Sequence, residues 1–278
     1  MLVNLNEVLL KAQKEHYAVG LFNTTDTDML EAAISAAEEL NSPIIIGTAE
    51  VLLPYGELKL IAPSVIAAAK RASVPVVVHY DHGLTFERCM EALSLGFSSI
   101  MFDGSAKDNE TNLKETAQLV KIAHSLGATV EGEIGHVGEA ANNDGSVSDM
   151  YTTVEEAVDF INATGVDALA VAIGTAHGAY KTKPCLDINR LKEIRNAVDT
   201  PLVLHGGSGL SDDDFKNTVK NGIAKVNIFT DLCVAGVSAM NDGIKENLSY
   251  TEIRAKKVEA IKEAVKNKIN LFGSANKA

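Results

Sequence analysis

Short runs of apolar residues alternate with amphipathic stretches about eight times along the chain. Within the runs, Val, Ile, Leu and Ala are nearly continuous, which is typical of strands buried on both faces of a parallel sheet. The runs that we interpret as strands are Ala18–Asn23, Pro43–Thr48, Pro75–Asp81, Ser98–Asp103, Thr129–Ile134, Ala168–Gly174, Pro201–His205 and Ala224–Thr230.

The stretches between these runs carry apolar residues at helical spacing, as in the stripe formed by Leu113, Ala117 and Val120. Eight alternating β–α units favour a closed barrel over an open sheet, so we expect an α/β fold of the (β/α)8 TIM-barrel type. No linker rich in Gly, Ser or Pro interrupts the chain. This predicts one domain over residues 1–278, with an extra C-terminal helix at Tyr250–Ile269.

One connection departs from the short loops of the repeat. The segment Gly135–Thr153 is long and rich in Gly and Asn, and its only branched aliphatic residues are Val137 and Val147. Loops of this kind are typically lids over an active site or disordered segments. We therefore expect a mobile lid or a disordered segment here.

Composition narrows the range of functions. The chain has 278 residues, 46% hydrophobic and 22% charged, with a net charge of -12. No basic run stands out, so we expect no nucleic-acid partner, and no apolar stretch approaches the roughly 20 residues of a membrane span. Asn4, Asn6 and Glu7 interrupt the N-terminal apolar run, which argues against a signal peptide. The three scattered cysteines are typical of reduced thiols, so we expect a cytoplasmic protein.

Polar residues recur where the predicted strands end, which in a TIM barrel is the face that carries the active site. His82, His177 and His205 lie at or just after three of these ends. Three imidazoles and one open position make a catalytic zinc site, in which nearby carboxylates can orient the rings. The other polar residues at this rim are Asn23, Asp81, Asp103, Glu131, Glu133, Asn227 and Thr230.

These residues also have structural interpretations. The Asp81–His82 pair is compatible with an N-cap before a helix at Thr85–Leu95, and Asp103 with a cap of the following loop. Glu131 and Glu133 share strand parity, so both are expected inside the barrel, as a structural pair or beside a metal. The histidines that we interpret as ordinary polar residues are His16, His79, His124 and His136.

Two glycine-rich turns follow predicted strands. The turn at residues 205–209, His-Gly-Gly-Ser-Gly, precedes a helix that begins near Ser211, and the turn Gly174–Gly178 is followed by Lys181. Bare backbone N–H groups in such turns bind phosphate, helped by the helix dipole. Tight turns need glycine for backbone reasons alone, but each of these two also contains a candidate metal ligand. We therefore expect an anionic group to bind beside the metal.

With these motifs in this order, the chain resembles the class II (zinc-dependent) fructose/tagatose-bisphosphate aldolase family along nearly its whole length. The segments that carry the resemblance are Tyr17–Asn23, Val78–Gly83, Met101–Ser105, Glu131–Gly135, Ile173–Lys181, Leu204–Gly209, Lys225–Ile228 and Lys268–Ala275. The resemblance implies a zinc enzyme on a TIM barrel that acts on a small phosphorylated sugar. It also implies a homodimer or homotetramer, and a monovalent cation (Na⁺ or K⁺) near the phosphate.

The resemblance further implies roles for individual residues. It implies Asp81 as the catalytic acid/base. The implied metal set is His82, His177 and His205, with Asp103 and Glu133 near an alternative metal position. The substrate-binding residues that we expect on this basis are Asn23, Gly178, Lys181, Gly206, Gly207, Ser208, Asn227 and Thr230.

The chain departs from the family pattern at two places. The family's mobile loop has an acidic residue that moves a proton on the ketone fragment, whereas this chain has Ala141 there. Glu139 is our candidate for the catalytic residue that replaces it. Fructose-specific members commonly have Asp at the position of Phe229. This difference favours the tagatose-type or broader ketose-bisphosphate group.

We therefore expect reversible aldol cleavage of a ketose 1,6-bisphosphate to dihydroxyacetone phosphate and glyceraldehyde 3-phosphate. The sequence leaves open fructose or tagatose bisphosphate, a related phosphorylated sugar acid, and a non-catalytic or partner-dependent aldolase-like subunit. A barrel metallohydrolase would share the histidines but would not need both phosphate turns. An imine-forming aldolase is disfavoured, because Lys225, the one lysine within the predicted strands, lies at the N-terminal end of its strand.

Overall fold

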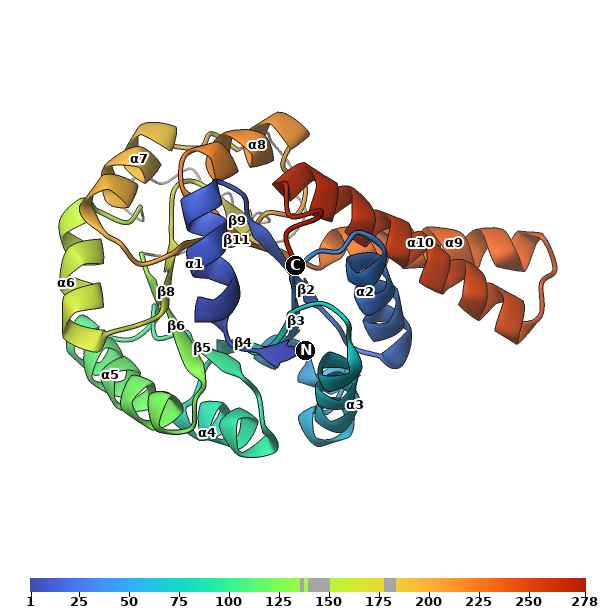
Figure 1. Cartoon of the computed structure of the whole chain (residues 1–278), viewed down its shortest axis with the longest axis horizontal. Helices are drawn as coiled ribbons and strands as arrows, with labels where there is room; N and C mark the ends of the chain where they lie inside the picture. Colours follow the sequence, from blue (N-terminus) through green and yellow to red (C-terminus); the bar gives the residue numbers. More distant parts are fainter. Residues whose placement is uncertain (136–137, 140–150, 178–183) are drawn as a thin grey trace.

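The computed structural model describes residues 1–135, 138–139, 151–177 and 184–278, with the backbone alone for residues 138–139 and 176–177. Eight parallel strands close into a barrel, because β4 pairs with β3 on one side and with β5 on the other (Figure 1). In order around the wall, the strands are β4 (Val76–Gly83), β3 (Ile44–Ala49), β2 (Val19–Asn23), β11 (Ile223–Ile228), β10 (Leu202–Leu204), β8 (Ala168–Val171), β6 (Thr129–Ile134) and β5 (Ser99–Phe102). Each strand lies at a predicted apolar run, so the predicted (β/α)8 barrel is confirmed.

Helices surround the barrel and bury their apolar faces against the outside of the strands (Figure 1). They are α2 (Thr27–Glu39), α3 (Leu58–Arg71), α4 (Phe86–Leu95), α5 (Asn109–Ser125), α6 (Val154–Thr164), α7 (Ile188–Ala197), α8 (Asp212–Lys220) and α9 (Thr230–Lys245), with a 3-10 helix η1 (Glu50–Tyr55) after β3. The predicted C-terminal helix is present as α10 (Tyr250–Phe272), which packs on α9 and α2. It continues past Ile269 and ends where Gly273 adopts the left-handed φ of 76° that favours glycine.

The helix α1 (Leu5–Glu15) closes the N-terminal end of the barrel. Its buried residues Leu5, Val8, Leu9 and Ala12 pack against apolar side chains inside the barrel wall. In Figure 1, α1 lies across the ring of strands, and the short strand β1 (Leu2–Val3) before it pairs with the start of β4. The interior of the barrel at the N-terminal ends of the strands is therefore apolar and closed by α1.

The inward-facing positions of single strands change from apolar to polar along the barrel. In β2 the sequence runs from Val19 and Leu21, which pack in the apolar interior, to Asn23. In β4 the same alternation runs from Val77 to the buried residues His79 and Asp81. Because side chains alternate with a period of 2 along a strand, one parity places apolar residues at the base and polar residues at the mouth.

Most of the loop predicted at Gly135–Thr153 lies outside the described residues, so the expected lid stays a prediction. Its described backbone includes the short strand β7 (Gly138–Glu139), which pairs in parallel with β9 (Ala176–His177). Elsewhere, none of the helices in the described part of the chain has the length and apolar character required to cross a membrane.

A substitution in α1 tests the importance of the apolar plug. Leu9→Ala is expected to lower the free energy of unfolding by about 2–5 kcal/mol, because Leu9 is fully buried and its truncation leaves a cavity. Leu10→Ala, at a neighbouring position that is 52% exposed, is the matched control and should change stability by less than about 0.5 kcal/mol. Urea unfolding measures both. Equal effects of the two substitutions would contradict the plug.

Candidate active site

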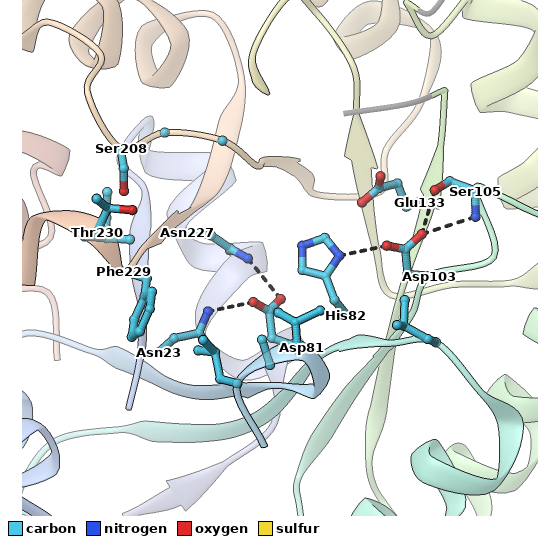
Figure 2. Close-up of a pocket in the computed structure, with 17 residues that line it drawn as sticks. Asn23, Asp81, His82, Asp103, Ser105, Glu133, Ser208, Asn227, Phe229 and Thr230 are labelled. Carbon is cyan, nitrogen blue, oxygen red and sulfur yellow. Dashed lines mark hydrogen bonds and ion pairs between the residues drawn. The ribbon is translucent and has the colours of Figure 1, made fainter. Parts of the chain in front are cut away.

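A cavity of about 340 Å³ opens at the C-terminal ends of the strands (Figure 2). Its polar lining comes from strands and turns that are far apart in the sequence, so the closed barrel brings these residues together. The lining residues are Asn23, Asp81, His82, Asp103, Ser105, Glu133, Gly206, Gly207, Ser208, Asn227 and Thr230, with Ala49, Val51, Leu52, Leu84, Ile228 and Phe229 as the apolar part.

The end of β4 places two consecutive side chains, Asp81 and His82, in the same cavity. Neighbours in a regular strand point to opposite faces, but His82 has a left-handed φ of 45° that breaks the alternation. The register with β5 is also irregular between Tyr80 and Gly83. At Gly83, a Cβ atom would lie 2.8 Å from the carbonyl oxygen of Met101, so the close approach requires glycine. The turn at the strand end thus creates the Asp81–His82 pair.

His82 and His205 face each other at the centre of the site. Nε2 of His82 lies 2.8 Å from Nδ1 of His205. The second nitrogen of each ring is bound by a carboxylate: Nδ1 of His82 donates to Asp103 at 2.8 Å, and Nε2 of His205 donates to Glu131 at 2.8 Å. Since both outer N–H groups are donated to carboxylates, the facing nitrogens present lone pairs, which need a proton or a metal ion between them. Metal-binding histidines are oriented in this way.

The charge on His82 is set by the carboxylates around it. Burial opposes a charged imidazole, but Asp81, Asp103 and Glu133 outweigh it and raise the pKa of His82 to about 10. Burial also opposes ionisation of Asp103, yet the hydrogen bond from His82 holds the pKa of Asp103 well below its usual range. Carboxylates therefore surround His82, and its imidazole ring is positively charged when no metal is bound.

Glu133 is the second sign that the site suits a cation. Burial and repulsion by Asp103 raise the pKa of Glu133 to about 8. Its Oε2 atom is buried without a hydrogen-bond partner among the described residues, and it lies 3.7 Å from Nδ1 of His205. Ligand atoms of Asp81, His82 and His205, and those of His82, Asp103 and Glu133, form two groups within 4.8 Å. These nitrogen and oxygen donors fit a divalent metal such as zinc.

The structure therefore brings together two of the three histidines expected as zinc ligands. The backbone of His177 is described in β9, but its side chain lies outside the described part of the structure, so its role stays a prediction. The same holds for the side chain of Glu139, and for Gly178 and Lys181, which lie outside the described residues altogether.

Asp81 is held by two side-chain amides, as Figure 2 shows. Asn23 Nδ2 donates to its Oδ2 at 2.8 Å, and Asn227 Nδ2 donates to its Oδ1 at 3.0 Å. Burial opposes its charge, but His82 and Lys225 outweigh burial and keep the pKa of Asp81 well below its usual range. Asp81 is therefore an ionised carboxylate with both oxygens held in place, which leaves it able to accept a proton.

Of the two acidic residues that were also expected as caps, Asp103 has such a structural role and Asp81 does not. The helix-cap interpretation of Asp81 is wrong, because Thr85 caps α4 by accepting from the backbone N–H of Arg88. The loop-cap interpretation of Asp103 is confirmed, since its Oδ1 accepts from the backbone N–H and the hydroxyl of Ser105. Its other oxygen still orients His82, so the same carboxylate performs both tasks.

The glycine-rich turn after β10 lines the cavity through Gly206, Gly207 and Ser208. At α8, the helix expected to assist anion binding, a capping box between Ser211 and Asp214 satisfies the backbone N–H groups of these two residues, and the expected anion site stays a prediction. The start of α9, at Thr230, reaches the cavity, and no side chain among the described residues caps it. Its first N–H groups are therefore available to an anion. In Figure 2, Ser208 and Thr230 lie side by side.

Lys225 lies near the N-terminal end of its strand, as predicted, but its side chain reaches the site. The fully buried side chain extends from β11 until Nζ lies 2.8 Å from Glu131 Oε2 and 2.7 Å from Asn227 Oδ1. Burial opposes the charge on Glu131, and the Lys225 ammonium lowers the pKa of Glu131 to about 2. Strand parity with Asn227 was the signal that could have shown Lys225 facing inward.

Comparisons with known proteins agree over the full length of the chain. The profile described as "Fructose-bisphosphate aldolase class-II" matches residues 3–277. A fructose-bisphosphate aldolase of Thermus caldophilus is 39% identical over 306 residues, covering 100% of both chains. A 6-phospho-5-dehydro-2-deoxy-D-gluconate aldolase of Bacillus licheniformis is 38% identical over 283 residues, covering 99% of this chain and 96% of its own. The crystal structure of the YdjI aldolase from Escherichia coli K12 has a TM-score of 0.92 at 37% identity, with 100% of both chains covered.

Metal binding at this site is expected to release protons. At pH 7, below the pKa values of about 10 for His82 and about 8 for Glu133, both groups are protonated in the metal-free protein. A cation binds the deprotonated forms, so its binding should release about one to two protons at pH 7, and affinity should rise with pH. Calorimetric zinc titrations in buffers with different ionisation enthalpies measure this number. Proton uptake, or an affinity that falls as pH rises through 7, would contradict the site.

Proposed function

Because the chain belongs to the class II fructose-bisphosphate aldolase family, whose members are lyases, we propose that it is a zinc-dependent aldolase of ketose 1,6-bisphosphates. The proposed reaction is reversible cleavage to dihydroxyacetone phosphate and glyceraldehyde 3-phosphate. The observation that carries the proposal is the fixed, ionised carboxylate of Asp81 beside two facing imidazoles, each oriented by a carboxylate.

Zinc is the metal that we propose for His82, His177 and His205, with Asp103 and Glu133 beside an alternative position. When bound, the ion supplies positive charge that stabilises negative charge developing on the oxygens of the ketone fragment. Nitrogen donors, together with carboxylates as orienting groups, support zinc over Mg²⁺ or Ca²⁺, which prefer all-oxygen sites.

Asp81 is the proposed acid/base. In cleavage its carboxylate takes the proton of the C4 hydroxyl group as the C3–C4 bond breaks and leaves its electron pair on the ketone fragment. In condensation that bond forms again, and Asp81 returns the proton to the C4 oxygen. The amides of Asn23 and Asn227 hold both oxygens, so the carboxylate does not need to reorient before it accepts the proton. The low pKa keeps it ionised at neutral pH. Glu139 is our proposal for the residue that moves a proton on the ketone fragment, in place of the family's loop acid.

The C1 phosphate is proposed to lie between the glycine turn and the start of α9. Gly206, Gly207, Ser208 and Thr230 line this part of the cavity, and backbone N–H groups there match the phosphate oxygens. On the family resemblance, Gly178 and Lys181 complete the phosphate site, with Na⁺ or K⁺ nearby. We further propose a cytoplasmic homodimer or homotetramer.

Phe229 supports a substrate outside the fructose-specific group. Its ring lies in the cavity beside Asn23 and Thr230 in Figure 2, where an apolar surface cannot accept a hydrogen bond from a sugar hydroxyl. Tagatose 1,6-bisphosphate is therefore our first candidate. A phosphorylated sugar acid is a second candidate, because the Bacillus licheniformis relative carries the name of an aldolase for such a compound. Cleavage assays on both ketose bisphosphates and on the sugar acid decide between them.

Replacement of the proposed acid/base should reduce turnover strongly. Asp81→Ala is expected to lower kcat by about 10²–10⁴-fold, because the proton on the C4 hydroxyl then has no acceptor. The control is Asp108→Ala, which removes the N-cap of α5 outside the cavity and should cost about 1 kcal/mol of stability without loss of kcat. A coupled assay of triose phosphate release measures both variants. Full activity of Asp81→Ala would exclude the proposed role.

Two chemical treatments separate the metal route from an imine route. Chelator should abolish activity, and added zinc should restore it, because the proposed reaction depends on the ion. Borohydride in the presence of substrate should leave activity intact, because the proposed mechanism forms no imine on a lysine such as Lys225. Inactivation by borohydride together with resistance to chelator would contradict the metal assignment.

A further inference from the structure

Lys225 is fully buried inside the barrel next to the active site. It contacts one residue that orients a proposed metal ligand and one residue that binds the proposed acid/base. The ammonium of Lys225 binds Glu131 Oε2 at 2.8 Å and donates to Asn227 Oδ1 at 2.7 Å. We propose, on the basis of the proposed function, that Lys225 is a positioning residue. It holds the metal-binding ring of His205 through Glu131 and the proton-transferring carboxylate of Asp81 through Asn227.

The first branch of this arrangement runs through Glu131. One carboxylate oxygen of Glu131 binds Lys225, and the other accepts the Nε2 proton of His205 at 2.8 Å. This contact fixes the tautomer of His205 so that Nδ1 faces His82. Contacts that orient a metal ligand in this way are typically worth 10–100-fold in metal affinity or activity. Lys225 holds the other carboxylate oxygen of Glu131 at 2.8 Å, and both residues are fully buried, so this contact keeps the carboxylate in place.

The second branch runs through the side-chain amide of Asn227. An amide can point its oxygen or its nitrogen either way, and the partners decide the orientation. An ammonium has only donors, so Asn227 Oδ1 must face Lys225, and Nδ2 then donates to Asp81 Oδ1 at 3.0 Å. In the opposite orientation the amide oxygen would face the carboxylate, which is repulsive. Lys225 therefore selects the amide orientation that holds Asp81.

The two branches explain why the ion pair lies at this position. Charge balance alone would require only the contact between Lys225 and Glu131. The additional contact with Asn227 links the orientation of His205, in the loop between β10 and α8, to the orientation of Asp81, on β4. A positioning role therefore predicts losses in metal affinity and in kcat that restored charge balance does not reverse.

The test uses two variants of the full-length protein. Lys225→Met removes the ammonium at similar volume. The double variant Glu131→Gln with Lys225→Met also removes the unpaired buried charge, so it separates positioning from charge balance. Zinc affinity is measured by competition with a chromogenic chelator. Then kcat and KM are measured at saturating zinc on whichever sugar phosphate the unmodified protein cleaves.

In the folded double variant we expect zinc affinity and kcat each to fall by about 10–100-fold with little change in KM. Lys257→Met is the matched control, since Lys257 also binds two carboxylates, Asp26 and Asp28, outside the cavity. It should keep both properties. Parent-like zinc affinity and kcat in the double variant would overturn the proposal, as would failure of both Lys225 variants to fold while Lys257→Met folds. If the unmodified protein cleaves none of the sugars, the proposed function fails, and the zinc measurement still decides the role of Lys225.

Discussion

Carboxylates near the mouth of the barrel need positively charged partners, and the arrangement of the site follows from this constraint. Asp81, Glu131 and Glu133 are buried there beside the half-buried Asp103, and burial makes each charge costly unless it has a partner. Lys225 balances Glu131, and the protonated ring of His82 balances part of the remainder. Glu133 Oε2, which has no hydrogen-bond partner among the described residues, and the facing nitrogens of the two histidines mark the position that fits a cation. A divalent cation at this point satisfies all of them at once.

The fold creates this concentration of charge without weakening the core. The large core between the helices and the outside of the strands, together with the apolar plug formed by α1, supplies the burial that stabilises the domain, so the C-terminal end of the barrel interior can carry polar groups. A left-handed residue at the end of β4 then turns His82 into the cavity beside Asp81. The apolar residues that close the barrel and the polar residues that line the site thus lie at opposite ends of the same strands, as is usual in this fold.

The sequence predicted much of this arrangement. Buried parallel strands are nearly continuous apolar runs, so all eight were located, and the polar residues at their ends marked the site. The reach of Lys225 was missed, because strand parity gives the direction of a side chain but not how far it extends along the barrel. The sequence did not identify the start of α9 as a helix end at the cavity, because Thr230 was expected at the end of the last strand and instead begins this helix. The orientation of each ring also required coordinates, since it depends on partners such as Glu131 that are distant in sequence.

We propose that His82 and His205 bind one ion through the two nitrogens that face each other, and X-ray absorption at the zinc edge of the zinc-loaded protein tests this arrangement. We expect nitrogen or oxygen ligands at about 2.0–2.1 Å with imidazole scattering, and weaker imidazole scattering in His205→Ala. Sulfur ligands, or an unchanged spectrum in both His82→Ala and His205→Ala, would contradict it.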